Sequence, residues 1–160
     1  MTNIRPFRPL DDRSAALSFI DGAIVFEHDF EPNRRLDGSV AEDYLTELLK
    51  AVTEREGQIF VAEDAHGTPV GWGIVHLSMD DVYVVDGERS FAYIAELYVV
   101  ERMRAKGIGR ALITACEEWA RKRDVNVMQI GVLPGNDRAH AIYQMAGYSD
   151  YGIQLRKYLR

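Results

Sequence analysis

The sequence is short of several features, and each shortage excludes a class of protein. Its 160 residues include one cysteine, five prolines and no long hydrophobic run. The single cysteine, Cys116, cannot form an internal disulfide or build a thiolate metal site alone, which fits a reducing compartment. No segment approaches the roughly 18 apolar residues that span a bilayer, and the first ten residues lack the apolar stretch of a signal peptide. We therefore expect a cytoplasmic protein with no membrane partner.

Positive charge is also scarce. Lys and Arg number 19 against 25 Asp and Glu, which gives a net charge of −6 and a pI near 5.2. A nucleic-acid binder needs cations that displace counterions from phosphates, so we expect no nucleic-acid partner. The four histidines show no metal-ligand spacing, and there is no G-x-S-x-G nucleophile motif, so we predict no metal and no serine nucleophile. The histidines are His28, His66, His76 and His140.

The remaining composition is that of an ordinary globular protein, with 47% apolar and 28% charged residues. No repeat or compositional break divides the chain, so we predict one domain over residues 1–160. Apolar periodicity predicts helices at 11–26, 39–56, 108–123 and 137–145, and strands at 4–8, 59–63, 70–77, 91–100, 125–132 and 153–159. Gly22 is expected to interrupt the first helix, and Ser39 with Glu42 to form a capping box at the second. This order favours an α/β (α+β mixed) fold with helices on both faces of a mixed sheet.

One segment carries a signal for chemistry, because a strand ending near Val100 runs through a glycine loop into a helix. Gly107 and Gly109 allow backbone amides to turn toward a common point, and the following helix adds its unpaired N-terminal N–H groups. Such a loop binds phosphate. The side chains of Arg104, Lys106 and Arg110 add positive charge around it. The Walker pattern and the dinucleotide-binding fingerprint both fail here, because no Gly-Lys-Ser/Thr follows the loop and position 112 is leucine.

The loop sequence from Arg104 to Gly109 resembles the R-x-x-G-x-G/A pyrophosphate loop of the GNAT superfamily of acetyl-CoA-dependent N-acetyltransferases. Asn136, Ala139 and Tyr143 then match the N-x-x-A-x-x-x-Y motif of that family, and a Gly-Tyr pair follows where the family has Gly-Phe. Two positions depart from the family pattern: Glu101 replaces a common proline, and Ala105 replaces a frequent glycine. Neither change removes a backbone amide, so we expect pyrophosphate binding to survive.

The resemblance implies a GNAT-like, mostly antiparallel sheet that splays apart between strands 4 and 5, at residues 96–99 and 129–132. Pantetheine would lie in the gap like an added strand, because unpaired strand amides can bond its amides. It also implies acetyl-CoA as cosubstrate and direct transfer of acetyl to a primary amine of a small molecule or peptide in a ternary complex. The implied cofactor-binding residues are Leu97, Tyr98, Val99, Arg104, Ala105, Lys106, Gly107, Ile108, Gly109, Arg110, Asn136 and Tyr143.

Two catalytic residues are predicted from this chemistry. An ammonium group with a pKa of about 10.4 cannot attack a thioester until a base takes its proton, and Glu96 is the candidate base. Tyr143 is the candidate acid for the departing thiolate. The alternatives are that Glu96 is an ion-paired or solvated carboxylate and that Tyr143 is a core aromatic. The oxyanion is expected to be held by a backbone amide near 97–99.

Acceptor recognition is predicted at Glu27, His28, Asp29 and Glu31, with Asp150 and Tyr151 as further candidates, because carboxylates attract a cationic amine. The alternative is a plainly solvated surface. A noncatalytic acetyl-CoA sensor and an enzyme that uses the loop for ATP or NAD are the other hypotheses. The sequence does not choose the acceptor, and it leaves a homodimer open.

Overall fold

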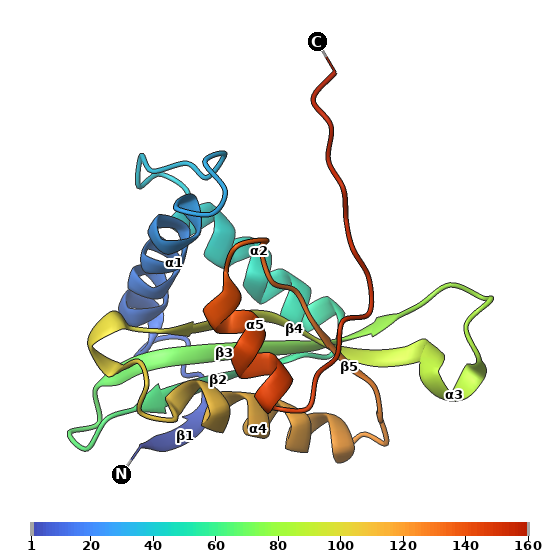
Figure 1. Cartoon of the computed structure of the whole chain (residues 1–160). Helices are drawn as coiled ribbons and strands as arrows, with labels where there is room; N and C mark the ends of the chain where they lie inside the picture. Colours follow the sequence, from blue (N-terminus) through green and yellow to red (C-terminus); the bar gives the residue numbers. More distant parts are fainter. Residues whose placement is uncertain (1, 160) are drawn as a thin grey trace.

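A computed structural model describes residues 2–159 and contains one five-stranded sheet in the order β1-β2-β3-β4-β5. The strands are β1 (Asn3–Pro6), β2 (Gln58–Glu63), β3 (Pro69–Met79), β4 (Ser90–Val99) and β5 (Met128–Ile130). The first four strands pair antiparallel, and β5 pairs parallel with β4 (Figure 1). β1 lies at an edge of the sheet and ends at Pro6, which suits a residue that cannot donate a ladder hydrogen bond.

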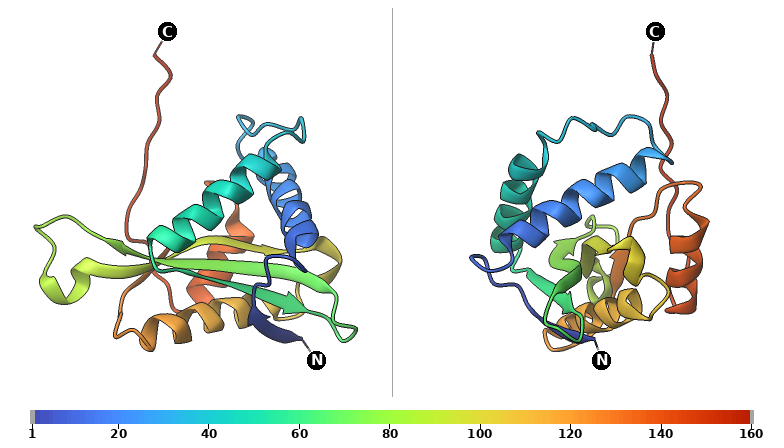
Figure 2. Two further views of the ribbon diagram at one scale, coloured as in Figure 1. Left: turned by 180° about the vertical axis from the view of Figure 1, so that it is seen from behind. Right: turned by 90° about the vertical axis from the view of Figure 1, so that its left-hand side faces the viewer.

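Helices cover both faces of the sheet, as Figure 2 shows. One face carries α1 (Arg13–His28) and α2 (Ala41–Glu54), and the other carries α4 (Ile108–Arg121), with α5 (Asp137–Met145) beside it. A short helix α3 (Asp86–Arg89) precedes β4, and a 3-10 turn η1 (Glu101–Met103) follows it. Separate apolar clusters fill the two layers. Trp72 and Ile74 face α1 and α2, whereas Val75 and Ile94 face α4 together with Cys116, which is a core residue. The predicted mixed sheet with helices on both faces is confirmed.

Three local predictions about the N-terminal half and the sheet edge are wrong. α1 continues through Gly22 without a break. The glycine makes room for the Tyr98 side chain of β4, because a Cβ at this position would lie 2.2 Å from the Tyr98 hydroxyl. Ser39 does not cap α2, since its hydroxyl donates to Asp37 at 2.6 Å and the helix begins at Ala41. The strand predicted at 125–132 is reduced to β5, because pairing with β4 stops at Ile130.

The predicted final strand at 153–159 is also wrong. Residues 149–159 have no secondary structure, and every one of them is exposed. Figure 1 shows this segment leaving the sheet as an extended tail. Its alternating apolar residues gave it a strand pattern, but within the described residues the tail leaves the sheet and pairs with none of the five strands.

Candidate active site

The loop between β4 and α4 presents a row of backbone amides. Within the part of the chain that the structure describes, no backbone N–H group of residues 105–110 donates to a protein acceptor. Ala105 and Gly107 have φ of 62° and 80°, and such left-handed residues turn successive N–H groups to one side. No atom lies within 4 Å of a Cβ built on Gly107 or Gly109, so a phosphate could approach the backbone there. This arrangement fits the pyrophosphate that the motif predicts.

The three cationic side chains of this loop, those of Arg104, Lys106 and Arg110, differ in their contacts. Arg104 Nε donates to the Val99 carbonyl oxygen at 2.9 Å, and its guanidinium carbon lies 4.6 Å from the ring centroid of Phe26 on α1. Arg104 therefore ties the end of β4 to α1 and does not stand free before the amides. Lys106 and Arg110 are exposed beside the loop. Arg110 Nη1 donates to the Met145 carbonyl oxygen at 3.3 Å, and Lys106 Nζ has only the Met103 sulfur at 3.4 Å as a partner among the described residues.

The sheet opens where the resemblance predicts. β5 pairs only with residues 92–94 of β4, whereas β3 pairs with β4 as far as Val99. On its β5 side, the stretch of β4 that contains Leu97, Tyr98 and Val99 therefore has no strand partner among the described residues. Apart from the Val99 carbonyl oxygen, which accepts from Arg104, the backbone groups on this edge can bond an extended ligand, as in strand addition.

A β-bulge determines which way Glu96 points. Ile74 pairs with Glu96 and Val75 with Ile94, so Ala95 is the extra residue in β4. Without the bulge, Glu96 would share a face with Ile94 and lie over α4. With it, Glu96 turns to the α1–α2 face, where the Tyr44 hydroxyl of α2 donates to its carboxylate oxygen Oε1.

The pKa of Glu96 is raised to about 7, chiefly because burial disfavours the charged carboxylate. The Tyr44 hydrogen bond opposes this change by stabilising the anion, and the nearby negative charge of Glu27 adds to the increase. Among its described neighbours, Glu96 forms no ion pair with a cation. A carboxylate with a pKa near neutral and an open strand edge beside it is suited to act as a base.

Tyr143 of α5 lies within electrostatic range of Glu96. Burial raises the pKa of Tyr143 to about 12, and the charge of Glu96 contributes to that increase. The ring also packs against the α4-side core and lies 6.3 Å from the Tyr148 ring. Tyr143 is therefore a packed aromatic whose hydroxyl stays protonated at neutral pH, which both interpretations of the sequence require.

The other predicted residues fall in different places. The Asn136 side chain accepts a hydrogen bond from the Ala139 N–H at 3.2 Å and caps α5, while its contact to pantetheine stays a prediction. Glu27 bonds Arg34 at 2.7 Å and influences Glu96, so it lies toward the site. His28 is bonded to the Arg34 carbonyl oxygen, and Asp29 is an exposed residue that ends α1.

The sequence interpretation missed Tyr44 as a functional residue. Its position in the apolar stripe of α2, beside Leu45 and Leu48, gave it the pattern of an ordinary core aromatic. The only signal was a hydroxyl on an otherwise apolar stripe. A hydroxyl in such a place needs a hydrogen-bond partner, and the sequence could not say that the partner would be Glu96.

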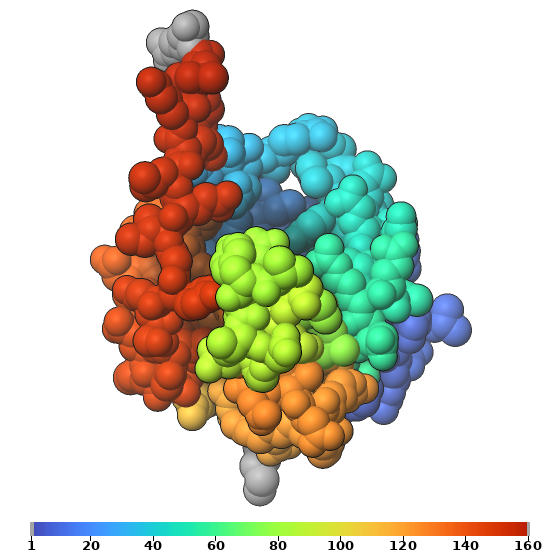
Figure 3. Space-filling view, turned by 90° about the vertical axis from the view of Figure 1, so that its right-hand side faces the viewer, coloured from blue at the N-terminus to red at the C-terminus, as the bar shows by residue number. Residues whose placement is uncertain are grey.

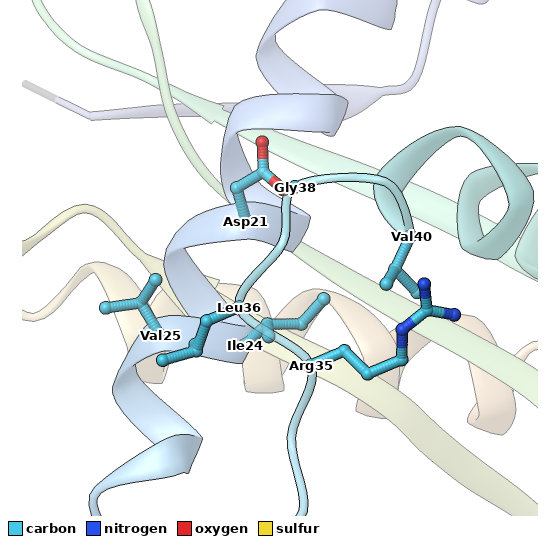
Figure 4. A pocket seen from close by; sticks show the side chains of 7 residues that line it. All are labelled: Asp21, Ile24, Val25, Arg35, Leu36, Gly38 and Val40. Carbon is cyan, nitrogen blue, oxygen red and sulfur yellow. The ribbon is translucent and has the colours of Figure 1, made fainter.

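A hollow of about 160 Å³ lies between α1 and the loop that leads to α2 (Figure 4). Its lining includes Asp21, Ile24, Arg35 and Leu36, and none of the predicted site residues takes part. Small-molecule sites usually measure about 300–1,000 Å³, so this hollow is too small to hold the substrates expected here.

Two further observations concern residues 2–159. They contain no cluster of three or more His, Cys, Asp or Glu side chains that could hold a metal ion. None of the helices in this range has the length and apolar character needed to cross a bilayer.

Comparison with known proteins identifies the class. The model of the acetyltransferase (GNAT) family matches residues 24–148. Aminoglycoside N(6')-acetyltransferase type 1 from Stenotrophomonas maltophilia is 31% identical over 111 residues, which cover 69% of this chain and 71% of that protein. The chain therefore belongs to the GNAT family, and it is an N-acetyltransferase with acetyl-CoA as cosubstrate.

Solved structures confirm the fold. A mutant of protein BH1408 from Bacillus halodurans superposes with a TM-score of 0.82 at 20% identity, with 99% of each chain covered. A predicted acetyltransferase from Clostridium acetobutylicum, solved with acetyl-CoA, superposes with a TM-score of 0.75 at 15% identity and covers 99% of this chain and 96% of that one. The splayed sheet predicted from the sequence is thus a GNAT sheet.

Proposed function

We propose that this enzyme acetylates a primary amine of a small cationic molecule by direct attack in a ternary complex, with Glu96 as the base. The observation that carries this proposal is a carboxylate of raised pKa beside the open edge of β4, held by Tyr44 and without a cation. An aminoglycoside amine is the best-supported acceptor class, because a relative that is 31% identical carries that activity in its name. Glu27 and Glu31, which pair with Arg34 and Arg156 in the structure, would attract such a polycation in exchange for these partners.

The raised pKa of Glu96 makes proton removal easier. An ordinary glutamate has a pKa of about 4.3, so taking a proton from an ammonium with a pKa of about 10.4 costs about 8 kcal/mol. With the Glu96 pKa at about 7, the same transfer costs about 5 kcal/mol. Burial of the carboxylate thus removes about 3 kcal/mol from the cost of producing the free amine.

The backbone and Tyr143 would handle the later steps. Acetyl-CoA supplies an activated thioester whose carbonyl carbon accepts the amine lone pair. A backbone N–H at residues 97–99 would hold the carbonyl oxygen while it carries negative charge. As the carbon–sulfur bond breaks, the Tyr143 hydroxyl would donate a hydrogen bond to the sulfur, which departs as a thiolate. The proton that the attacking nitrogen then loses goes to solvent, and an acetamide remains. With its pKa at about 12, Tyr143 is a weak acid. We therefore assign it chiefly hydrogen-bond stabilisation of the thiolate.

The test is a screen of thiol release from acetyl-CoA with a panel of amines, which comprises aminoglycosides, polyamines, amino acids and peptides with free N-termini. We expect the highest kcat/KM with an aminoglycoside. A clear preference for peptide N-termini, or for neutral amines over polycations, would overturn the acceptor assignment. In the same assay, Tyr143→Phe is expected to lower kcat while leaving the dissociation constant of acetyl-CoA within about twofold. Full turnover by this variant would make Tyr143 only a packing residue.

A further inference from the structure

A second hollow lies on the α4 side of the sheet, opposite the face to which Glu96 turns. It has a volume of about 430 Å³, which falls within the range of about 300–1,000 Å³ that small-molecule sites usually have. The C-terminal half of α4 forms one wall, and β1 and β2 form the other. Figure 3 shows the orange C-terminal end of α4 at the surface beside the blue N-terminal segment. Residues that line the hollow include Ile4, Phe60, Glu118, Trp119, Lys122 and Arg123.

The indole of Trp119 lines this hollow and lacks a hydrogen-bond acceptor. Trp119 is 5% exposed, and its Nε1–H group has no partner among the described residues. A buried tryptophan N–H usually finds an acceptor, so an unpaired one calls for an acceptor from outside the chain. The indole N–H of Trp72 is also unpaired, but Trp72 packs against Phe19 inside the core on the other face of the sheet and does not line the hollow. Trp119 differs because it adjoins space that a ligand can fill.

Two cationic side chains of the hollow have no anionic partner. The guanidinium carbon of Arg123 lies 4.2 Å from the centroid of the Trp119 ring, and Arg123 Nη1 donates to the Trp119 carbonyl oxygen at 3.3 Å. Within residues 2–159, neither Arg123 nor Lys122 forms an ion pair, whereas the neighbouring Arg121 pairs with Glu117. An anion bound by Arg123 would therefore lie against the indole whose N–H needs an acceptor.

The other lining residues determine the size and charge of the ligand. Ile4 and Phe60 present apolar surface from the sheet, and the indole presents an aromatic face, so a flat apolar body fits between them. Glu118 is exposed and forms no ion pair in the described chain, so the two cations outnumber the one carboxylate of the lining. This balance suits a ligand with one negative charge and disfavours a polyanion such as a nucleotide.

We propose that this hollow is a second ligand site, which binds a small aromatic monocarboxylate such as a hydroxybenzoate. The carboxylate bonds Lys122 and Arg123 and accepts from the Trp119 N–H, while the ring packs on the apolar wall of the sheet. The site is separate from the acetyl-transfer site, because Trp119 follows Gly107 by about twelve residues of α4, which is about 18 Å at about 1.5 Å per residue.

The first experiment titrates 4-hydroxybenzoate into the isotope-labelled full-length protein and follows the indole N–H signals by NMR. The chain has two tryptophans, so Trp119→Phe assigns both signals by removing one. We expect the Trp119 signal to shift saturably, with a dissociation constant below about 1 mM, while the Trp72 signal stays in place. Any other pattern, including two unchanged signals or equal shifts of both, would overturn the proposal.

Calorimetry with the same probe tests the charged residues, which are exposed and can be changed without disturbing the core. Lys122→Ala and Arg123→Ala should each weaken binding about tenfold or more, because each removes a hydrogen bond between charged groups. Arg121→Ala is the matched control, since it removes the same charge from the same helix end outside the hollow, and it should stay within about twofold. Equal losses in all three variants would assign the effect to net charge and contradict a site.

Two further titrations test the ligand class and the separateness of the site. Glu118→Gln should bind phthalate, a dianion, about fivefold more tightly than the wild type does, because a repelling charge is removed. An unchanged phthalate affinity would contradict the assignment of Glu118. Saturating acetyl-CoA should leave the dissociation constant of 4-hydroxybenzoate within about twofold. Displacement of the probe by acetyl-CoA would show that the two share one site, which overturns the proposal. None of these readouts depends on acetyl transfer, so they stand or fall separately from the proposed function.

Discussion

Asp12 is a buried carboxylate and Glu96 a partly buried one, and their pKa values move in opposite directions. Asp12 is 2% exposed, and two nitrogens of Arg5 bond its two oxygens at 2.7 and 2.8 Å. These bonds hold the pKa of Asp12 below its usual value. Glu96 has only the Tyr44 hydroxyl, and burial raises its pKa to about 7. The presence of a cation therefore separates a carboxylate that stabilises the fold from one that can exchange a proton.

The two groups also give stability opposite pH dependences. The folded-state pKa of Asp12 is below its unfolded value of about 3.9, so its contribution is present above that pH and is lost as pH falls through the folded pKa. The pKa of Glu96 is higher in the folded state, so ionising Glu96 costs stability as pH rises from about 4.3 to about 7. The proposed base, Glu96, is thus a residue whose ionisation near neutral pH lowers the stability of the fold.

The largest effect is expected for Glu96→Gln. The amide keeps an oxygen that can accept the Tyr44 hydrogen bond but cannot take a proton, so turnover should fall at least tenfold and the acid limb of the pH–rate profile should disappear. The free energy of unfolding at pH 8 should be unchanged or higher, because an unpaired buried charge is removed. Steady-state thiol release and urea denaturation measure the two quantities. Wild-type kinetics would remove Glu96 from its role.

Asp12→Asn is expected to lower the stability of the fold without altering the binding of acetyl-CoA. Arg5 would keep Glu63 as a partner and could still donate to the remaining amide oxygen, but the second bond and the ion pair with Asp12 would be lost, and breaking a buried ion pair costs about 3 kcal/mol. The urea midpoint should fall, and the loss should become smaller as pH drops below about 3.9, because the unfolded chain then takes up a proton that the ion-paired carboxylate of the folded state resists. Acetyl-CoA binding measured by calorimetry under stable conditions should be unaltered. A stable variant with weakened binding would contradict the division between the two carboxylates.

The features that depend on residues close together in the sequence could be predicted from it. The glycine loop and α5 were predicted from spacing, and the limits of α5 agree with the structure, because a capping asparagine and a following glycine mark its ends. Glu96 was selected as the base from its place on the strand before the loop. The Asp12–Arg5 pair was not predicted, since it joins α1 to β1 through side chains whose meeting depends on the packed fold.

The other features that the sequence did not predict also depend on contacts between segments far apart in the chain. The Ala95 bulge that aims Glu96 at Tyr44 depends on the register between β3 and β4, which no local pattern encodes. The interruption expected at Gly22 is absent because Tyr98 packs there. The alternating pattern of residues 153–159 is that of a strand, but a strand also needs a pairing partner, and in the described structure this segment leaves the sheet and pairs with no strand.

Tyr44→Phe sharpens the comparison, because it removes the only hydrogen bond that favours the Glu96 anion. The pKa of Glu96 should rise further, by about 1 pH unit, since a hydrogen bond to a charged group contributes about 1.5 kcal/mol. Turnover at pH 7 should fall about fivefold and recover at pH 9, where the carboxylate is ionised again. The pH–rate profile measures this displacement. An acid limb that stays in place or moves to lower pH would show that Tyr44 only packs against α1 and β4.

The smallest effect is expected for Glu27→Gln, which acts on Glu96 through space. The negative charge of Glu27 raises the pKa of Glu96, but Arg34 pairs with Glu27 and solvent screens its field. The acid limb should therefore move to lower pH by only a few tenths of a unit, while KM for a polycationic acceptor rises because one attracting carboxylate is lost. Asp29→Asn removes the same charge two residues away at an exposed position, and it should leave the acid limb unchanged. If both variants moved the limb equally, the effect would come from net charge, and Glu27 would have no special place beside the base.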